Sequence, residues 1–87
     1  MLVRKAVMLE LHELQVFLVA AETENFSEAG RILQVSQPAV SAQIQALEQR
    51  LNTQLFDRAG RNIRLNEMGR ALVPLVRSLL KLSLIHI

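Results

Sequence analysis

The sequence predicts a small, mainly α-helical domain with one short β-hairpin and a long final helix. Three observations support this. Of the 87 residues, 51% are apolar but only 3% are aromatic, which favours helices over a sheet. Apolar residues recur at helical spacing in four segments, and strand-like alternation around a glycine occurs once. The length allows one domain, near the size at which a single core is only just adequate.

The composition also excludes several classes of protein. The absence of cysteine excludes disulfides, thiolate catalysis and zinc-finger ligation. The apolar runs are far shorter than the roughly 20 residues of a membrane-spanning helix. There is no nucleophile with its base, no glycine loop for phosphate, and no second ligand near His12. We expect a soluble, cytoplasmic protein that is not an enzyme, needs no cofactor or metal, and does not contact a membrane.

Charge is distributed unevenly along the chain. Residues 1–30 hold two basic and five acidic residues, a balance of −3, whereas residues 31–87 hold eight basic and three acidic residues, a balance of +5. This asymmetry suggests an anionic partner for the second part. The alternative is that helix C-termini favour Arg and Lys without any ligand.

The first predicted helix is amphipathic. Residues 1–8 are expected to be a disordered lead, and the helix should run from Leu9 or Leu11 to about Glu22. Its apolar stripe consists of Leu11, Leu14, Phe17, Leu18 and Ala21.

A second, shorter helix follows a break in the periodicity. Ser27 is the expected N-cap, with Phe26 placed to pack against the new helix. The helix should end near Leu33 or Gln34, and its expected buried residues are Ala29, Ile32 and Leu33.

The third helix is the segment around which the chain is organised. Ser36 is a suitable N-cap, and Pro38 in the first turn has a backbone angle already suited to a helix. The core face is predicted to consist of Val40, Ile44, Leu47 and Leu51. Because only a few residues separate this helix from the one before it, the pair matches a helix-turn-helix.

The other side of the third helix is small or amide-bearing and almost uncharged. It carries Pro38, Ala42, Gln45 and Gln49, with Gln37 and Ser41 at its border. Glutamine amides can pair with adenine edges, and short side chains leave room for thymine methyl groups in a DNA major groove. The alternative is that glutamine and alanine are simply good helix formers.

Two short strands are expected next, Leu55–Arg58 and Asn62–Leu65, around a glycine-containing turn at 59–61. This hairpin would be a wing beside the helix-turn-helix. It carries three arginines that could bind phosphates or enter a minor groove, or could simply be solvated: Arg58, Arg61 and Arg64.

The last predicted helix is capped by Asn66 and carries an extended apolar stripe. The stripe is formed by Met68, Leu72, Leu75, Leu79 and Leu82, widened by Ala71, Val76 and Leu80. Such a stripe usually packs against another helix, so we expect a homodimer. The expected contact residues are Met68, Leu72, Leu75, Val76 and Leu79. The alternative is packing on its own domain, and Pro74 is expected to bend the helix.

Several linked motifs resemble one family. They are L-x-x-F in the first helix, N-F-S-E-A, V-S-Q-P-A-V-S-A-Q-I-Q-A-L-E, and L-F-D-R-x-x-R-x-I-x-L-N-E-M-G. From Leu11 to about Leu80 the chain resembles the N-terminal winged helix-turn-helix domain of LysR-type transcriptional regulators. The resemblance implies a DNA-binding domain over 9–65 and a dimer-forming linker helix over 66–87.

The resemblance also implies roles for individual residues. Major-groove positions are Gln37, Pro38, Ser41 and Ala42. Phosphate contacts are implied for Ser27 and Ser36, and wing positions for Arg58 and Arg61. Ala42 and Gln45 stand where longer or basic residues are common in the family, so fewer charged contacts to bases are expected.

We therefore expect sequence-specific binding of double-stranded DNA by a dimer that regulates transcription. Such regulators continue into an effector-binding domain, so we interpret the chain as a truncated regulator or a fragment, with a small-molecule effector only if that domain exists. Two alternatives remain open at this point. One is the winged-helix domain of another regulator class, such as the molybdate-responsive type, and the other is a helical protein-interaction module.

Overall fold

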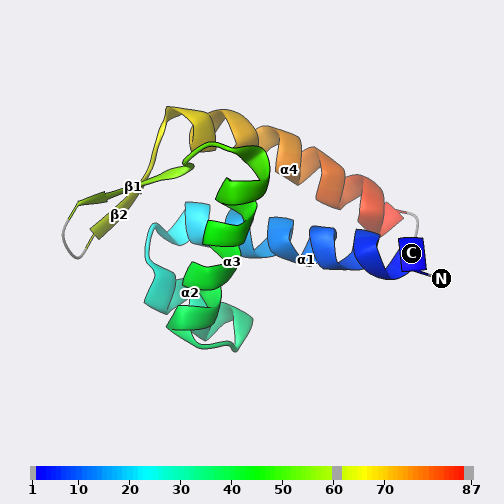
Figure 1. Cartoon of the computed structure of the whole chain (residues 1–87), viewed down its shortest axis with the longest axis horizontal. Coiled ribbons are helices and arrows are strands. Elements are labelled where there is room, and N and C mark those ends of the chain that lie inside the picture. The colour runs from blue at the N-terminus through cyan, green and yellow to red at the C-terminus, as the bar shows by residue number, and fades with distance from the viewer. Residues whose placement is uncertain (1, 60–61, 86–87) are drawn as a thin grey trace.

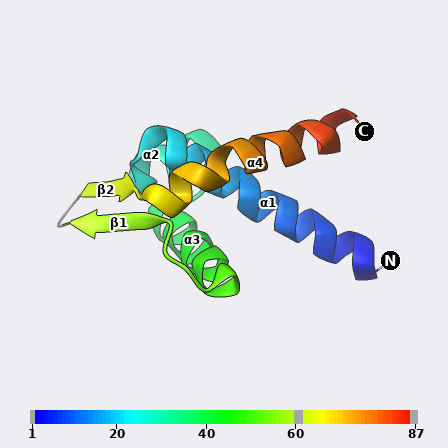
Figure 2. The same cartoon turned by 90° about the horizontal axis from the view of Figure 1, so that it is seen from above.

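The computed structural model describes the backbone of residues 2–59 and 62–85, and the side chains of residues 11–58 and 62–81. Its helices and strands follow one another along the chain as α1 (Leu2–Thr23), α2 (Phe26–Leu33), α3 (Gln37–Leu51), β1 (Phe56–Ala59), β2 (Asn62–Leu65) and α4 (Glu67–Ile85). In Figure 1 the hairpin projects at one end of the molecule, and the start of α1 and the end of α4 lie at the other. Figure 2 shows α4 crossing back over α1 after the hairpin. The predicted winged helix-turn-helix with a long final helix is confirmed.

The core forms around α1, which contacts α2, α3 and α4. Phe56 at the start of β1 packs edge-on against Phe17 of α1, with ring centroids 5.9 Å apart, and against Phe26 of α2, at 5.6 Å. These three rings connect the hairpin to two helices. The rest of the buried core is aliphatic and consists of Val16, Ala20, Ala21, Ala29, Val40, Ile44, Leu47, Leu55 and Val76.

The N-terminal segment differs from the expectation. The helix α1 begins at Leu2, so residues 2–8, which we predicted to be a disordered lead, are helical. The predicted stripe of α1 is largely confirmed, because Phe17 and Ala21 are buried, and Leu14 and Leu18 pack against the core. Within the described ranges, none of the helices is both long enough and apolar enough to cross a membrane.

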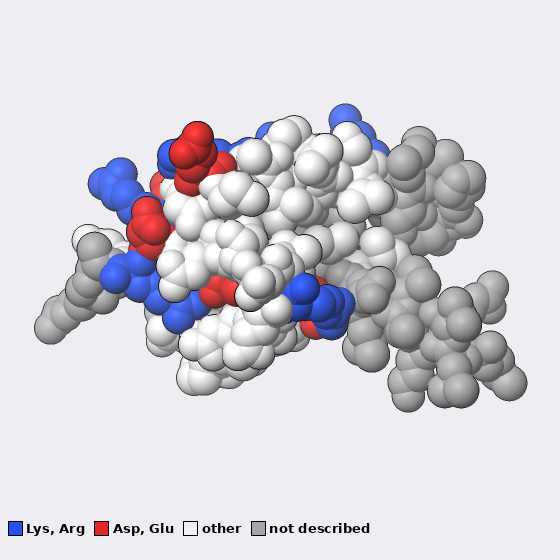
Figure 3. Space-filling view, turned by 45° about the horizontal axis from the view of Figure 1, so that its top comes forward, with Lys and Arg blue, Asp and Glu red and all other residues white. Residues whose placement is uncertain are grey.

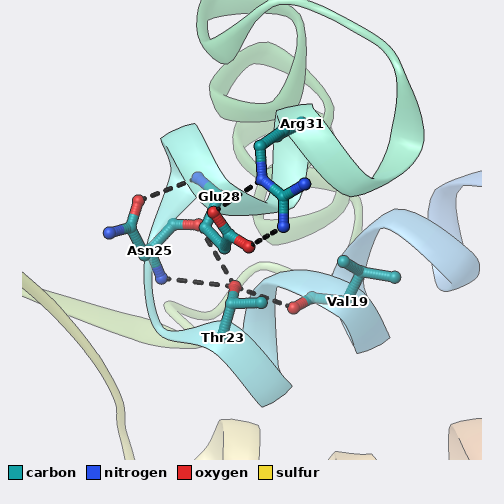
Figure 4. Close-up of polar contacts among 5 residues, drawn as sticks. All are labelled: Val19, Thr23, Asn25, Glu28 and Arg31. Atoms are coloured by element: carbon teal, nitrogen blue, oxygen red, sulfur yellow. Dashed lines mark hydrogen bonds and ion pairs between the residues drawn. The ribbon is translucent and has the colours of Figure 1, made fainter.

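The start of α2 also differs, because its N-cap is Asn25 and not Ser27. The Asn25 side chain accepts a hydrogen bond from the backbone N–H of Glu28 at 2.9 Å (Figure 4). Burial of Phe26 fixes it as the first helical residue, so Ser27 falls inside the first turn and is exposed. Glu28 pairs with Arg31 one turn later (Figure 4), and this hydrogen bond lowers the pKa of the Glu28 carboxyl.

The turn between α2 and α3 is tight. Gln34 adopts a left-handed backbone, with φ 60°, and the N–H of Val35 bonds the Gly30 carbonyl at 2.9 Å. A Cβ on Gly30 would lie only 2.7 Å from the Val35 carbonyl oxygen, so the close approach requires glycine. The predicted cap at Ser36 is confirmed, because its hydroxyl accepts the Ala39 N–H at 3.2 Å.

Two predicted core residues are exposed. Ile32 is 50% exposed, because the buried side of α2 is centred on Phe26, Ala29 and Gly30, and the winding of the helix turns Ile32 away from that centre. Leu51 is 46% exposed because it is the last residue of α3, where the chain turns through Asn52. The other three residues of the predicted α3 core face are buried.

The hairpin and the start of α4 agree with the prediction. The two strands are antiparallel, and the Ala59↔Asn62 pair leaves a two-residue connection at 60–61, outside the described residues. The first strand begins and ends one residue later than predicted, so Ala59, which we expected in the turn, belongs to β1, and Leu55 is buried before it. Asn66 caps α4 by accepting the Gly69 N–H at 2.8 Å, as predicted. Pro74 lies inside α4.

Candidate nucleic-acid interface

The outer face of α3 is open and uncharged. Its residues from Gln37 to Leu47 include no acidic or basic side chain. The helix packs on α1 and α2 through Val40, Ile44 and Leu47. The predicted major-groove residues are all on the accessible side: Gln37, Pro38, Ala42 and Gln45 are exposed, and Ser41 is half-buried. This face can therefore approach another surface closely without bringing charge to it.

A shallow cavity of about 220 Å³ lies between α3, the wing and the α1–α2 turn. It brings Ser27, at the start of α2, together with Gln37, at the start of α3. These two residues were predicted separately as a phosphate contact and a base contact. Asn62 and Ile63 of β2 complete the wall on the wing side. Sequence reasoning did not single out Asn62, although it directly follows the predicted turn of the hairpin.

The two predicted phosphate-binding serines occupy helix N-termini. Ser36 accepts the Ala39 N–H through its oxygen, so its hydroxyl hydrogen can still donate to an anion. Ser27 is exposed in the first turn of α2. Helix N-termini attract anions because their first N–H groups have no intrahelical acceptor. Both sites suit a phosphate oxygen.

The structure separates two wing arginines that the sequence grouped together. The guanidinium of Arg58 lies 5.6 Å from the centre of the Phe26 ring, and its Nη2 is 3.4 Å from Oε1 of Glu48. Arg58 pairs with Ile63 across the hairpin, whereas Arg64 pairs with Asp57, so the two arginines point to opposite faces. Arg64 is exposed.

The charge pattern of the wing is mixed. Figure 3 shows Lys and Arg side chains at the hairpin end of the molecule, with Asp and Glu side chains among them. The predicted contact Arg61 lies outside the described residues. In the part of the chain that the structure describes, no three His, Cys, Asp or Glu side chains gather as a metal site would require.

The apolar stripe on α4 is divided between the core and the surface. Met68, Leu75 and Leu79 are 55%, 61% and 50% exposed, and they recur at helical spacing on one side. Leu72 is half-buried against the core. Val76 is completely buried within its own domain, so its side chain is not available to a second chain, contrary to our expectation. The face of α4 that a second chain could contact is therefore narrower than the predicted stripe.

Comparison with known proteins agrees with this geometry. The family model for bacterial regulatory helix-turn-helix proteins of the lysR family matches residues 11–70. A regulator encoded between ibpB and leuC in Azotobacter vinelandii is 56% identical over 66 residues, covering 76% of this chain and 46% of that protein. The regulator YbhD of Escherichia coli K12 is 36% identical over 72 residues, covering 83% of this chain and 23% of that protein. The chain thus spans less than half the length of these relatives.

Solved structures show the same fold on DNA. The DNA complex of the CbnR DNA-binding domain superposes with a TM-score of 0.80 at 37% identity, covering 84% of each chain. The complex of the BenM DNA-binding domain with catB site 1 DNA gives 0.79 at 32% identity, covering 84% of this chain and 78% of the other. Since the family model covers more than half of the sequence, the chain belongs to the LysR family of bacterial helix-turn-helix regulators.

Proposed function

We propose that this chain is the DNA-binding part of a transcriptional regulator and that it binds specific sequences of double-stranded DNA as a homodimer. The observation that carries the proposal is the exposed, uncharged outer face of α3 beside a hairpin wing. An α-helix of this kind fits the major groove, which presents a distinct pattern of donors and acceptors for each base pair. Similarity to domains solved on DNA supports the same conclusion.

Base reading would depend on neutral side chains. Gln37 and Gln45 can each donate and accept through one amide, which suits an adenine edge, and Ala42 leaves space for a thymine methyl group. Pro38 and Ser41 lie beside them on the same accessible side. A good bidentate contact gives about 1–3 kcal/mol of discrimination against the wrong base.

Backbone binding would come from different groups. Ser27 and Ser36 at the two helix N-termini would contact phosphates, and Arg64 and Arg61 would supply positive charge from the wing. Because base reading uses no charged side chain of α3, the dependence of affinity on salt would come mainly from the wing and the remaining basic residues.

The dimer would form through the exposed face of α4. Met68, Leu75 and Leu79 form an exposed apolar strip that a second copy of the helix would cover, with Leu72 at its edge. Two α3 helices related by a twofold axis would then read half-sites about 34 Å apart, one helical turn of DNA. A small-molecule effector is proposed only for a longer protein that carries an effector-binding domain.

Selection of binding sites from a random-sequence duplex pool tests this function. The selected duplex and a scrambled duplex of equal composition would then be titrated at several salt concentrations. We expect the selected duplex to be preferred and log affinity to fall by about 0.9 per phosphate contact for each tenfold rise in salt. Failure to enrich any sequence, or binding that ignores salt, would contradict the proposal.

A further inference from the structure

One carboxylate joins α3 to the start of the wing. Glu48 lies in the last turns of α3, and its Oε2 accepts the backbone N–H groups of Leu55 at 2.8 Å and Phe56 at 3.3 Å. Its Oε1 is contacted by Arg58 at 3.4 Å. A single side chain of α3 thus contacts Leu55, just before β1, and Phe56 and Arg58 within β1.

A second carboxylate holds the other strand. Glu24, in the turn between α1 and α2, accepts the N–H of Leu65 at 2.8 Å, at the end of β2. Its backbone is left-handed, with φ 49°, which is uncommon for a glutamate. Leu65 and Phe56 are paired across the hairpin. The carboxylates of Glu48 and Glu24 therefore bind the end of the wing nearest the helices, one from α3 and the other from the turn between α1 and α2.

Both acids stand next to the surface proposed to face DNA. Glu24 lines the cavity that holds Ser27 and Gln37. Glu48 lines a hollow with Gln45 and Gln49 of the outer α3 face. A carboxylate repels DNA phosphates, so a carboxylate beside this surface lowers the affinity for DNA unless a structural role offsets the repulsion. A charged acceptor forms stronger hydrogen bonds to N–H groups than a neutral one, which is a reason to keep it.

We propose that Glu24 and Glu48, here called the wing clamp, are positioning residues that fix the angle between the wing and α3. The clamp sets where the wing meets the DNA backbone or minor groove while α3 occupies the major groove. Arg58 then belongs to the clamp and not to the DNA contacts, because it is held between Glu48 and the Phe26 ring. This inference rests on the proposed function.

Neutralising each glutamate of the wing clamp tests the proposal, because the clamp and simple charge repulsion predict opposite changes in DNA affinity. Glu48→Gln and Glu24→Asn each remove one negative charge, and asparagine also tolerates the left-handed backbone at position 24. Glu67→Gln removes the same charge from an exposed position at the start of α4 and serves as the control. Affinities of the full chain would be measured by fluorescence anisotropy on the duplex that the wild type selects.

Charge alone predicts that all three variants bind as tightly as the wild type or more tightly. The clamp predicts that Glu48→Gln and Glu24→Asn bind about tenfold more weakly, the size of a lost backbone or base contact, while Glu67→Gln does not. Clamp variants that bind like the control would overturn the proposal. A wild type that selects no sequence would instead refute the proposed function.

Footprinting separates positioning from general stability. In the clamp variants, protection of the minor groove against hydroxyl radicals should fall at the wing, whereas major-groove protection against base methylation should persist. Combining Glu48→Gln with Arg64→Ala should weaken binding by less than the product of the two single effects, because a displaced wing no longer uses Arg64. The proposal would be overturned if the double variant lost affinity by the full product of the two single effects. Equal loss of the minor-groove and major-groove footprints, or unfolding of both clamp variants in circular dichroism, would also overturn it.

Discussion

The glycine at position 69 provides a sharp test of how α4 is joined to the wing. Gly69 lies in the first turn of α4, and a Cβ there would meet the Leu55 carbonyl oxygen at 2.4 Å and the Leu65 side chain at 2.5 Å. The Leu55 oxygen cannot simply move away, because it accepts the Asn66 N–H at 3.0 Å. Gly69→Ala would therefore strain the junction of β1, β2 and α4.

The expected magnitude follows from two opposing terms. Alanine is favoured over glycine in a helix interior by about 1 kcal/mol, whereas forcing an extra carbon into a packed site costs about 1–3 kcal/mol. Weakening the hydrogen bond at Leu55 adds about 1 kcal/mol to the cost. We expect Gly69→Ala to lower the free energy of unfolding by about 1–3 kcal/mol in total.

Urea denaturation followed by circular dichroism, at fixed protein concentration, would measure this change. Ser78 is exposed in the same helix, so comparing Ser78→Ala with Ser78→Gly gives the helix propensity term without a steric contact. Gly69→Ala could instead raise the free energy of unfolding by as much as the difference between the alanine and glycine variants at position 78. That result would refute the close approach of Gly69 to Leu55 and Leu65.

Three further predictions concern the caps, the DNA contacts and the dimer. Asn25→Ala should lower the free energy of unfolding by about 1 kcal/mol through loss of the α2 cap, whereas Ser27→Ala should change it by less than about 0.5 kcal/mol; equal effects in urea denaturation would contradict the cap assignment. Gln37→Ala should cost about 1–3 kcal/mol on the selected duplex and little on scrambled DNA, while Arg61→Ala should weaken both alike; anisotropy titrations that show the same pattern for both variants would argue against base reading by Gln37. Leu75→Asp should convert a dimer to a monomer in light scattering, because it places a charge in the proposed apolar contact; an unchanged mass would move the interface elsewhere.

The sequence predicted features that depend on neighbouring residues. Ser36 and Asn66 were identified as caps because a cap contacts the chain only three residues away, and both contacts are present. The hairpin followed from alternation around a turn; its second strand is as predicted, and its first strand is shifted by one residue. The helix-turn-helix followed from the short spacing between two amphipathic segments.

Features that depend on tertiary packing were not predictable in the same way. Asn25 and Ser27 are both suitable caps, and burial of Phe26 against Phe56 decides between them. The α4 stripe gave no sign that Val76 faces inward while Leu75 faces outward, because that depends on where α1 lies.

The prediction of site residues was limited in the same way, because their contacts depend on tertiary packing. Arg58 was predicted as a DNA contact from its place in the hairpin, and no local pattern indicates that Glu48 and Phe26, on other elements, lie beside it. Glu24 and Glu48 were not singled out at all, since a glutamate in a turn or a helix carries no local sign that it accepts backbone N–H groups 41 or 7 residues away.

The proposed function depends on reading of DNA sequence by the uncharged face of α3. The most direct test is the ratio of the affinities of the wild-type chain for the selected duplex and the scrambled duplex at physiological salt. Specific DNA-binding proteins show ratios of about 10³ or more, and we predict a ratio of this order that Gln37→Ala reduces. Equal affinity for the two duplexes would contradict base reading by α3, because the chain would then bind DNA through its phosphates alone.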